Sequence, residues 1–409
     1  MKIVESWNVK LVGALAALVL SPAPCARAMQ VVEQAEITLA IDADFPGGNI
    51  QVERVTGNVV DLHQDLRDTA GDWFYWYFRV RGAAGRTLTF HFTQSNVIGV
   101  RGPAVSRDQG MTWQWLGTSS VTGTSFTYEF PAQAAEIRFA FGIPYVQEDL
   151  RKFLARHQPD SALRIESLCE SAQGRQVEML HVGQLQREPD HRVLLTARHH
   201  ACEALASYVL EGLLETVLAD ESAGAWLREH VEFLVVPFVD KDGVEAGDQG
   251  KNRRPHDHNR DYRQRIYPSV KALTNLVPAW SGGKLRVALD LHCPHIRGPQ
   301  NEVVYCVGGP NAENWRQIMQ FGRTLESVQA GPLKYRAEDN LPFGKSWNTG
   351  SGHPSLQSFS AWAVELPGVK LATTIETPYA NVSGTEVTAD AARSFGRDLA
   401  HALRSYLER

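Results

Sequence analysis

The segment VLLTARHHACEAL occupies residues 193–205 and joins an apolar run to an amphipathic one. The run VLLTA at 193–197 predicts a buried strand, because only its threonine is polar. Apolar residues then recur every four positions from Leu205 to Val217, which predicts a helix beginning at about Ala201. A buried strand followed by a helix is the building unit of an α/β domain with a largely parallel sheet.

The same alternation continues along the rest of the sequence. The further predicted strands are VEFLVVPF (231–238), LRVALDLH (285–292), VVYCV (303–307) and LATTIE (371–376), and a last helix is predicted at 388–407. Helical sequence near residue 150, DLRKFLARH, precedes the series. We therefore predict an α/β domain at residues 151–409, with a largely parallel sheet between helices.

Upstream of residue 150 the pattern is different. Short aromatic and β-branched runs alternate with clusters of glycine, asparagine and aspartate, as in ITLAID (37–42), WFYWYFRV (73–80), TLTFHF (87–92), FTYEF (126–130) and EIRFAF (136–141). This pattern predicts an antiparallel β-sandwich domain at residues 29–150. The aromatic block from Trp73 to Phe78 is interpreted as core, in preference to a carbohydrate-binding face.

Composition limits the classes of partner. The 409 residues include 43% hydrophobic and 21% charged side chains, and the net charge is -5. An acidic chain of this kind has no general attraction for phosphate backbones or anionic lipid, so neither nucleic acid nor a membrane is expected as a partner. The oligomeric state is left open.

The first 28 residues have the layout of a secretory signal peptide. Two lysines precede the apolar run LVGALAALVL (11–20), and Ala26 and Ala28 form a cleavage site of the A-x-A type. A periplasmic or secreted protein is therefore predicted, although initiation at Met29 would give a cytoplasmic one.

Four cysteines follow this leader, and no two of them have CxxC spacing. They are Cys169, Cys202, Cys293 and Cys306. We interpret them as small buried side chains, and leave open whether any pair forms a disulfide.

Three residues are predicted to bind one zinc ion. His200 and Glu203 are three positions apart at the predicted start of a helix, so an imidazole and a carboxylate can converge on one ion. His292 ends a predicted strand, and open α/β sheets place their sites at the carboxyl ends of strands. Two histidines and one carboxylate, with a fourth position open, are typical of a catalytic zinc site.

A long polar loop, KDGVEAGDQGKNRRPHDHNRDY (241–262), lies between these ligands. Loops of this length without secondary structure are usually functional. Arg260, beside Asn259, could pair bidentately with the terminal carboxylate of a peptide.

These residues resemble the zinc carboxypeptidases of the carboxypeptidase A clan, and within it the cytosolic carboxypeptidase branch. The HxxE pair His200 and Glu203 and the Asn259–Arg260 pair carry the resemblance. The upstream stretches DFPGGNI, RGPAVSRDQGMTWQWLG and FAFGIPYVQEDL also look like the β-sandwich domain of that branch. The resemblance implies a mixed, largely parallel central sheet flanked by helices in the second domain.

The resemblance also implies roles for other residues. Glu376 matches the general base, and Asp257 matches an acidic residue behind the first ligand histidine. The arginine that stabilises the oxyanion falls at Arg253 or Arg254, and Arg253 is preferred. The tyrosine that carboxypeptidase A has some twenty residues before the base has no counterpart.

The expected function is hydrolysis of the C-terminal peptide bond of peptides or proteins, by a zinc-bound water that Glu376 activates. Two alternatives remain: a zinc amidase or deacylase of the same fold, acting on cell-wall peptides or acyl-amino acids, and a catalytically inert binding protein. Removal of acidic residues would require a basic side chain in the specificity pocket, for which Lys345, Lys370 and whichever of Arg253 and Arg254 is not the oxyanion arginine are candidates. The preferred C-terminal residue and the role of the sandwich domain stay open.

Overall fold

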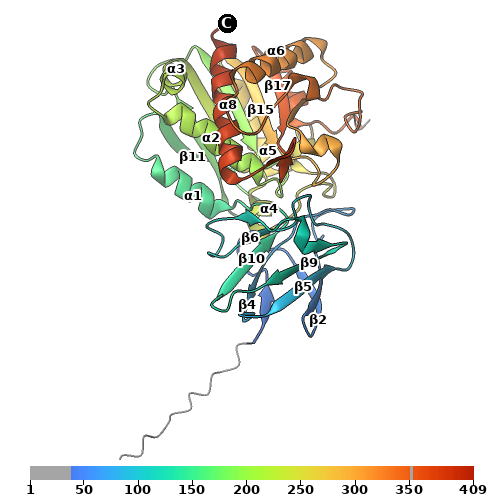
Figure 1. The fold of residues 1–409 in the computed structure, drawn as a ribbon. Helices are drawn as coiled ribbons and strands as arrows, with labels where there is room; N and C mark the ends of the chain where they lie inside the picture. Colours follow the sequence, from blue (N-terminus) through green and yellow to red (C-terminus); the bar gives the residue numbers. More distant parts are fainter. Residues whose placement is uncertain (1–37, 351–352) are drawn as a thin grey trace, which may run out of the picture. The chain divides into compact units, whose positions relative to one another are not determined.

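Ten short strands between Ala40 and Ala140 form two five-stranded sheets in the computed structural model, which describes residues 38–350 and 353–409 (Figure 1). The predicted signal peptide, residues 1–28, lies outside the described residues. One sheet has the order β1 (Ala40–Asp42), β4 (Tyr77–Arg81), β10 (Glu136–Ala140), β6 (Ala104–Ser106) and β7 (Gln114–Trp115). The other has the order β2 (Gln51–Thr56), β3 (Val59–His63), β5 (Thr87–Phe92), β9 (Ser125–Glu129) and β8 (Val121–Thr122).

Aromatic side chains fill the space between these two sheets. Phe78 and Phe139 from one sheet contact Phe90 and Phe126 from the other, with ring centroids 5.3–5.4 Å apart. Phe74–Phe78 are buried, which confirms the interpretation of this part of the aromatic block as core, whereas Trp73 is only half-buried. Pairing is antiparallel throughout the two sheets except between β3 and β5, which run parallel.

A seven-stranded mixed sheet forms the centre of the second part of the chain. Its order is β11 (Leu163–Glu170), β12 (Gln176–Gly183), β14 (Val231–Val236), β13 (His191–Ala197), β15 (Leu285–His292), β17 (Leu371–Glu376) and β16 (Tyr305–Val307). The four strands β14, β13, β15 and β17 are parallel to one another, and the remaining pairs are antiparallel. A small hairpin, β18 (Asn381–Val382) and β19 (Thr385–Glu386), follows.

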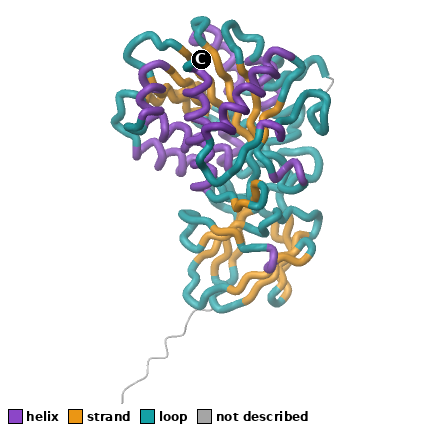
Figure 2. The backbone as a smooth tube through the Cα atoms, turned by 45° about the horizontal axis from the view of Figure 1, so that its top comes forward, coloured by secondary structure: helices purple, strands orange, loops and turns teal. Residues whose placement is uncertain are grey.

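Helices cover both faces of this sheet, whereas the sandwich is almost entirely strand and loop (Figure 2). The helices are α1 (Gln147–Arg156), α2 (Leu205–Leu218), α3 (Ser222–His230), α4 (Lys241–Ala246), α5 (Pro268–Ser281), α6 (Ala312–Val328), α7 (Phe359–Ala363) and α8 (Ala389–Leu407). Apolar residues of α2, α3, α6 and α8 share one core, and those of α5 and α7 share a second core on the opposite face. No helix of the described residues is long and apolar enough to cross a membrane.

Helices α2 and α8 pack with their backbones in contact. A side-chain carbon at Gly212 would collide with the carbonyl oxygen of Arg393, and one at Gly396 would collide with that of Val209. Only glycine allows this approach. The last helix is therefore packed directly against the helix that follows the HxxE pair.

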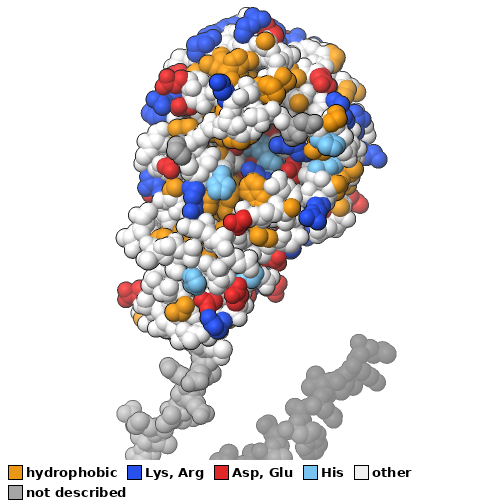
Figure 3. All heavy atoms as spheres, turned by 90° about the vertical axis from the view of Figure 1, so that its right-hand side faces the viewer, with side chains coloured by type: hydrophobic (Ala, Val, Ile, Leu, Met, Phe, Trp, Pro, Cys, Tyr) orange, Lys and Arg blue, Asp and Glu red, His pale blue; other side chains and the backbone are white. Residues whose placement is uncertain are grey.

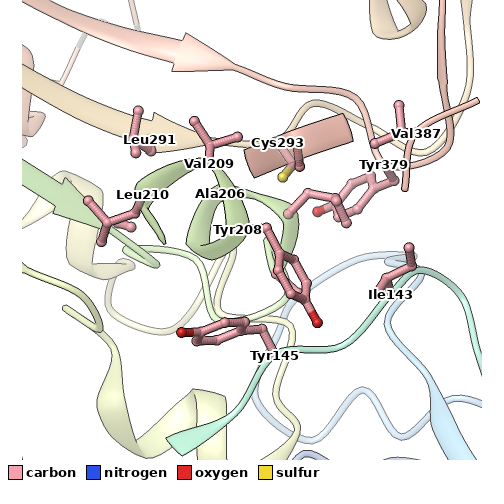
Figure 4. Packing of buried hydrophobic residues seen from close by; sticks show 14 of the residues in the cluster. Ile143, Tyr145, Ala206, Tyr208, Val209, Leu210, Leu291, Cys293, Tyr379 and Val387 are labelled. Carbon is pink, nitrogen blue, oxygen red and sulfur yellow. The ribbon is translucent and has the colours of Figure 1, made fainter. Parts of the chain in front are cut away.

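The sandwich and the second domain share contacts around the loop before α1. Tyr145 stacks edge-on against Tyr208 with ring centroids 5.0 Å apart, and its hydroxyl donates to Glu211 at 2.7 Å. The Tyr208 hydroxyl donates in turn to the carbonyl of Pro144. Figure 4 shows these two tyrosines, with Ile143 from the same loop facing Tyr379. The predicted domain boundary near residue 150 falls inside α1.

Two details of the predicted secondary structure were wrong near the site. The helix after β13 begins at Leu205 and not at Ala201, so His200 and Glu203 lie in the preceding turn. The polar loop 241–262 contains the short helix α4, where the Asp240 carboxylate accepts a hydrogen bond from the Gly243 amide as N-cap. The four cysteines within the described residues are free, and three of them are buried.

Candidate active site

The turn after β13 carries two of the predicted zinc ligands. Arg198, the first residue after the strand, has a left-handed backbone with φ 60°. Its buried guanidinium donates to the carbonyl of Ala201 at 3.0 Å and to that of Tyr145 at 2.9 Å. These hydrogen bonds fasten the turn to the loop before α1. His200 and Glu203 therefore project from a braced turn.

Donor atoms of three buried side chains converge beyond this turn. His200 Nδ1 lies 2.9 Å from Glu203 Oε1, and His292 Nδ1 lies 2.7 Å from Glu203 Oε2. The two ring nitrogens are 3.1 Å apart. Among the described residues Glu203 Oε2 has no hydrogen-bond partner. Its short distance to His292 Nδ1 therefore brings two potential ligand atoms together without a hydrogen bond. The three residues predicted as ligands are thus brought together.

The surroundings of the two rings suit a cation between them. Nε2 of His200 faces the Asp257 carboxylate at 3.7 Å, and Nε2 of His292 faces that of Asp290 at 2.6 Å. Since a carboxylate only accepts, each Nε2 can donate to its acid, and each Nδ1 would then present a lone pair to a bound metal ion. Two lone pairs and a carboxylate repel one another unless a cation joins them.

This donor set fits zinc. Two histidines and one glutamate are the ligands of a common class of catalytic zinc site, and donors at about 2.0–2.1 Å from a tetrahedral ion lie about 3.3 Å apart. The separations of 2.7–3.1 Å between the donor atoms of His200, Glu203 and His292 are close to this value.

A buried hydrogen-bond chain supports the third ligand. Asp290 Oδ2 lies 2.6 Å from His292 Nε2, and its Oδ1 lies 2.8 Å from His199 Nδ1. The other nitrogen of His199 lies 2.8 Å from the Tyr262 hydroxyl. Burial alone would raise the pKa of Asp290, but the two imidazoles hold that pKa well below its ordinary value. Asp290 therefore stays ionised and orients His292.

Asp290 was missing from the sequence prediction, although a signal was present. Asp290 and His292 are two positions apart on β15, and residues at that spacing on a strand point to the same face. The strand LRVALDLH is buried almost throughout. An acidic residue inside such a strand requires a polar partner, and His292 on the same face was the candidate.

Glu376 ends β17 and pairs in register with His292 at the end of β15. It is buried, and its Oε2 has no hydrogen-bond partner. Burial raises the pKa of Glu376, and the negative charge of Glu203 raises it further, while His292 and Lys251 act in the opposite direction. The side chain has the place and the free oxygen that a general base requires.

The short turn η2 (His258–Arg260) brings the predicted clamp beside the ligands. Asn259 Nδ2 lies 3.4 Å from His292 Nε2, and its Oδ1 accepts a hydrogen bond from the Phe359 amide at 3.0 Å. Arg260 is half-buried and donates to the carbonyl of Asn259 at 3.0 Å. Burial would raise the pKa of Asp257, but His200 and Arg260 hold it well below the ordinary value.

Arg253 lies among three carboxylates. Its guanidinium is 3.1 Å from Asp68, 2.9 Å from Asp240 and 2.9 Å from Asp248. Burial raises the pKa of Asp240 and of Asp248 to about 6, and the charge of Arg253 offsets part of this shift. The guanidinium is therefore occupied in an ion-pair cluster, which counts against the oxyanion role preferred for it from the sequence. The other candidate, Arg254, is exposed.

Two further residues of the site gave no signal in the sequence. Lys251 Nζ lies 2.7 Å from Glu203 Oε1. Tyr305, on β16, is opposite Glu376 in the antiparallel pair, and its hydroxyl is buried without a hydrogen-bond partner. Neither a lysine in a polar loop nor a tyrosine in an apolar strand stands out before the chain is folded.

The lysines considered for an acidic specificity pocket lie elsewhere or are exposed. Lys370 immediately precedes β17, whereas Glu376 ends it. Six residues of strand at about 3.3 Å each separate the two by about 20 Å, so Lys370 cannot line the site. Lys345 is exposed in the loop before α7.

One face of the molecule is hollowed, and side chains of histidine, of lysine or arginine and of aspartate or glutamate gather in the hollow (Figure 3). Charged and imidazole groups in a concave surface are the usual setting of an enzyme site.

Two family models match the chain. The model described as zinc carboxypeptidase matches residues 148–283, which include His200, Glu203 and the Asn259–Arg260 pair. The model described as the N-terminal domain of cytosolic carboxypeptidases matches residues 41–141, the region of the two five-stranded sheets.

Curated relatives agree with these models. An uncharacterized protein of Zymomonas mobilis is 31% identical over 239 residues, which cover 56% of this chain and 60% of that protein. Cytosolic carboxypeptidase 3 of Mus musculus is 26% identical over 289 residues, which cover 61% of this chain and 28% of that protein. The chain thus spans less than two thirds of the length of these relatives.

Solved structures share the fold over most of the chain. A metallo-carboxypeptidase from Burkholderia cenocepacia superimposes with a TM-score of 0.74 at 20% identity, covering 91% of this chain and 99% of that one. A metallo-carboxypeptidase from Pseudomonas aeruginosa, in complex with (2-guanidinoethylmercapto)succinic acid, gives a TM-score of 0.73 at 23% identity, covering 90% and 99%. The chain therefore carries a zinc carboxypeptidase domain, and the region before it matches the N-terminal domain of the cytosolic carboxypeptidases.

Proposed function

We propose that this chain is an exopeptidase that removes residues from the free carboxyl terminus of peptides or proteins, with one zinc ion per chain. The observation that carries the proposal is the free, buried oxygen of Glu376 beside the convergent donors of His200, Glu203 and His292. A carboxylate in this place serves no structural partner, and it is suited to move a proton.

Zinc bound by these three residues would lower the pKa of a bound water toward ~7 and polarise the scissile carbonyl. Glu376 takes a proton from the attacking water while the oxygen of that water forms a bond to the carbonyl carbon. The electron pair of the carbonyl moves to oxygen, and it returns when the carbon–nitrogen bond breaks. Glu376 then delivers the proton to the leaving amine, which gives a free amino acid and a shortened peptide with a new carboxyl terminus.

Asn259 and Arg260 would select the terminal bond. Asn259 is held within 3.4 Å of His292, so a carboxylate gripped by this pair stays close to the ligands. Among the residues that the structure describes, no acidic side chain lies within ion-pair distance of Arg260, which leaves its donors available. A planar guanidinium grips a carboxylate through two parallel hydrogen bonds.

The test compares matched peptides with free and amidated carboxyl termini. Zinc-loaded protein is incubated with both, and mass spectrometry identifies the released residue. Release of single residues from the free termini alone supports the proposal, and Arg260→Ala should raise KM for them. Equal cleavage of amidated peptides, or cleavage of muropeptides or acyl-amino acids alone, would replace the exopeptidase assignment.

The site of action is also proposed. The leader at residues 1–28 supports export to the periplasm or beyond, where substrates would be exogenous or cell-wall peptides. Cell fractionation of the full chain, with sequencing of the mature amino terminus, tests this. A protein that starts at Met29 in the cytoplasm would overturn it.

A further inference from the structure

Lys251 is a basic residue in direct contact with the ligand cluster. Its ammonium nitrogen lies 2.7 Å from Glu203 Oε1, and its side chain is only 14% exposed. Among the described residues, no other lysine or arginine forms an ion pair with His200, Glu203 or His292. The carboxylate of Glu376 also acts on its charge. A cation is therefore placed against a metal ligand, where it also feels the charge of the general base.

Arg253, the residue of this loop that the sequence favoured for the oxyanion role, is already held in ion pairs away from the ligand cluster. All three ion pairs of Arg253 are with Asp68, Asp240 and Asp248, none of which is a ligand. An ammonium group has three donors, and its contact with Glu203 uses one of them. Lys251 thus keeps donors for a further acceptor beside the ligand cluster, which Arg253 does not.

The N-terminal domain holds this lysine in place through its loop at residues 68–73. The Trp73 ring lies under the ammonium nitrogen at 5.3 Å, a distance at which an aromatic face attracts a cation. The Thr69 hydroxyl donates to the Lys251 carbonyl at 2.6 Å. The Asp68 carboxylate accepts from the amides of Gln249 at 3.1 Å and Gly250 at 2.8 Å.

The catalytic domain confines the same segment from the other side. Gly250 has φ +78°, and a side-chain carbon there would collide with the backbone nitrogen of Ala201, next to His200. The segment that carries Lys251 is therefore fixed between the ligand turn and the loop at residues 68–73.

We propose that Lys251 is the catalytic cation that stabilises the oxyanion formed at the scissile carbonyl, and that Trp73 and Asp68 of the N-terminal domain position it. This proposal rests on the proposed function. When water adds, the carbonyl electron pair moves to oxygen, and a free N–H of Lys251 donates to that oxygen while Glu376 holds the water proton. When the carbon–nitrogen bond breaks, the pair returns to the carbonyl and the hydrogen bond weakens.

A second explanation is that Lys251 only neutralises Glu203. In that case its removal would change zinc affinity and leave kcat unaffected. Lys251→Met distinguishes the two, because it keeps the length and apolar stem of the side chain without the charge. The measurements are kcat, KM, the zinc Kd by chelator competition, and the Kd of a phosphonate peptide analogue by calorimetry on the zinc-loaded protein.

If Lys251 binds the oxyanion, Lys251→Met loses about 10²- to 10³-fold in kcat, the size expected for one oxyanion donor. The phosphonate, whose anionic oxygens resemble the oxyanion, should lose affinity in parallel, while the zinc Kd is not weakened. Lys251→Arg should recover part of both losses. A kcat within about threefold of wild type, or a loss explained by missing zinc, would overturn the proposal.

Lys241→Met is the matched control. Lys241 is also buried, lies 2.8 Å from Glu178, and sits 5.0 Å from the Phe238 ring centroid, but it contacts no ligand. Its loss should lower stability and leave kcat unchanged. A fall in kcat as large as that of Lys251→Met would show a general effect of burying lysine, and would count against the proposal.

The positioning role is tested by Trp73→Leu, with Trp115→Leu as its control. Trp115 also contacts the catalytic domain, because its indole N–H donates to the Val387 carbonyl at 2.7 Å. Among the described residues, the aromatic ring that faces the Lys251 ammonium group is that of Trp73 and not that of Trp115. Trp73→Leu should lower kcat by about 3- to 30-fold with KM unchanged, in line with a partly desolvated cation–π contact. Equal kinetics for both leucine variants would refute the positioning role. If Lys251→Met does not fold, these two variants test the role of Lys251 in its place.

The failure of the proposed function would look different. If zinc-loaded wild type releases no C-terminal residue from any free-ended peptide, the exopeptidase assignment falls. If wild type is active and Lys251→Met matches it in kcat and in phosphonate affinity, only the role of Lys251 falls.

Discussion

Two buried glutamates in the central sheet have opposite surroundings. Glu232, near the start of β14, lies 2.7 Å from Arg192 Nε, 3.0 Å from His181 Nδ1 and 2.8 Å from the Trp280 indole nitrogen. Glu376, at the end of β17, has an oxygen without any hydrogen-bond partner. Burial raises the pKa of both carboxyls, but the partners of Glu232 bring its pKa down to about 2, whereas that of Glu376 stays raised.

The two glutamates show that one sheet can hold a carboxylate that stabilises the fold and another that is suited to catalysis. A buried carboxylate with its full set of donors stabilises the fold, and one that lacks a donor costs stability. Glu232, near the amino end of its strand, is therefore satisfied, whereas Glu376, at a carboxyl end where the ligands converge, is not. Groups kept in an unfavourable state in this way cluster at catalytic sites.

Replacing Glu376 should have the largest effect. Glu376→Gln removes the proton acceptor, so kcat should fall by about 10²- to 10⁴-fold while zinc content stays near that of wild type. Peptide hydrolysis and elemental analysis measure the two quantities. Glu232→Gln is the matched control, because it is the same change at the satisfied glutamate and should leave kcat unchanged. Full activity in Glu376→Gln would remove this residue from the mechanism.

Replacing Asp290 should have the next largest effect. Asp290→Asn can no longer anchor the protonated nitrogen of His292 as a charged acceptor, so zinc affinity should weaken by about 10- to 100-fold. Chelator competition measures the zinc Kd. Asp398→Asn is a suitable control, since Asp398 is equally buried and accepts from the amides of Ala330 and Gly331, remote from the ligands. An unchanged zinc Kd in Asp290→Asn would show that the chain behind His292 is not needed.

The smallest effect in this series concerns Glu232. Glu232→Gln should lower the free energy of unfolding at pH 7 by about 1–3 kcal/mol, because charged donors lose their ionic acceptor. Chemical denaturation measures it. Glu376→Gln, by contrast, should keep or raise that free energy. If both variants destabilise equally, the two glutamates do not differ as described.

The pH dependence of that stability loss has a defined sign. Because the pKa of Glu232 falls from 4.5 to about 2 on folding, its contribution is fully present above pH 4.5. It is lost as the pH falls from there toward 2, as the folded-state carboxylate becomes protonated. The gap in unfolding free energy between wild type and Glu232→Gln should therefore close over this range. A gap that stays constant down to pH 2 would contradict the lowered pKa.

The sequence predicted the parts of this protein that repeat a pattern. Apolar runs located β13, β15 and β17, chemistry at strand ends pointed to His200 and His292, and the family resemblance pointed to Glu376. Residues whose role depends on distant contacts were not predictable. The contacts of Lys251 with Glu203 and Trp73, and those of Arg253 with acids from two domains, appear only once the chain is folded. Strand β2 was missed because all six of its residues are exposed and it shows no apolar alternation.

The glycine contact between α2 and α8 sets a limit on how this sequence can drift. Any side chain at Gly212 or Gly396 would push apart two helices, one of which begins two residues after Glu203. A saturation library at these two positions, selected for activity, should return glycine almost alone, although neither residue touches the site. Two positions without a catalytic role would then tolerate almost no substitution. In related enzymes they would be invariant because the helix packing leaves no room for a side chain.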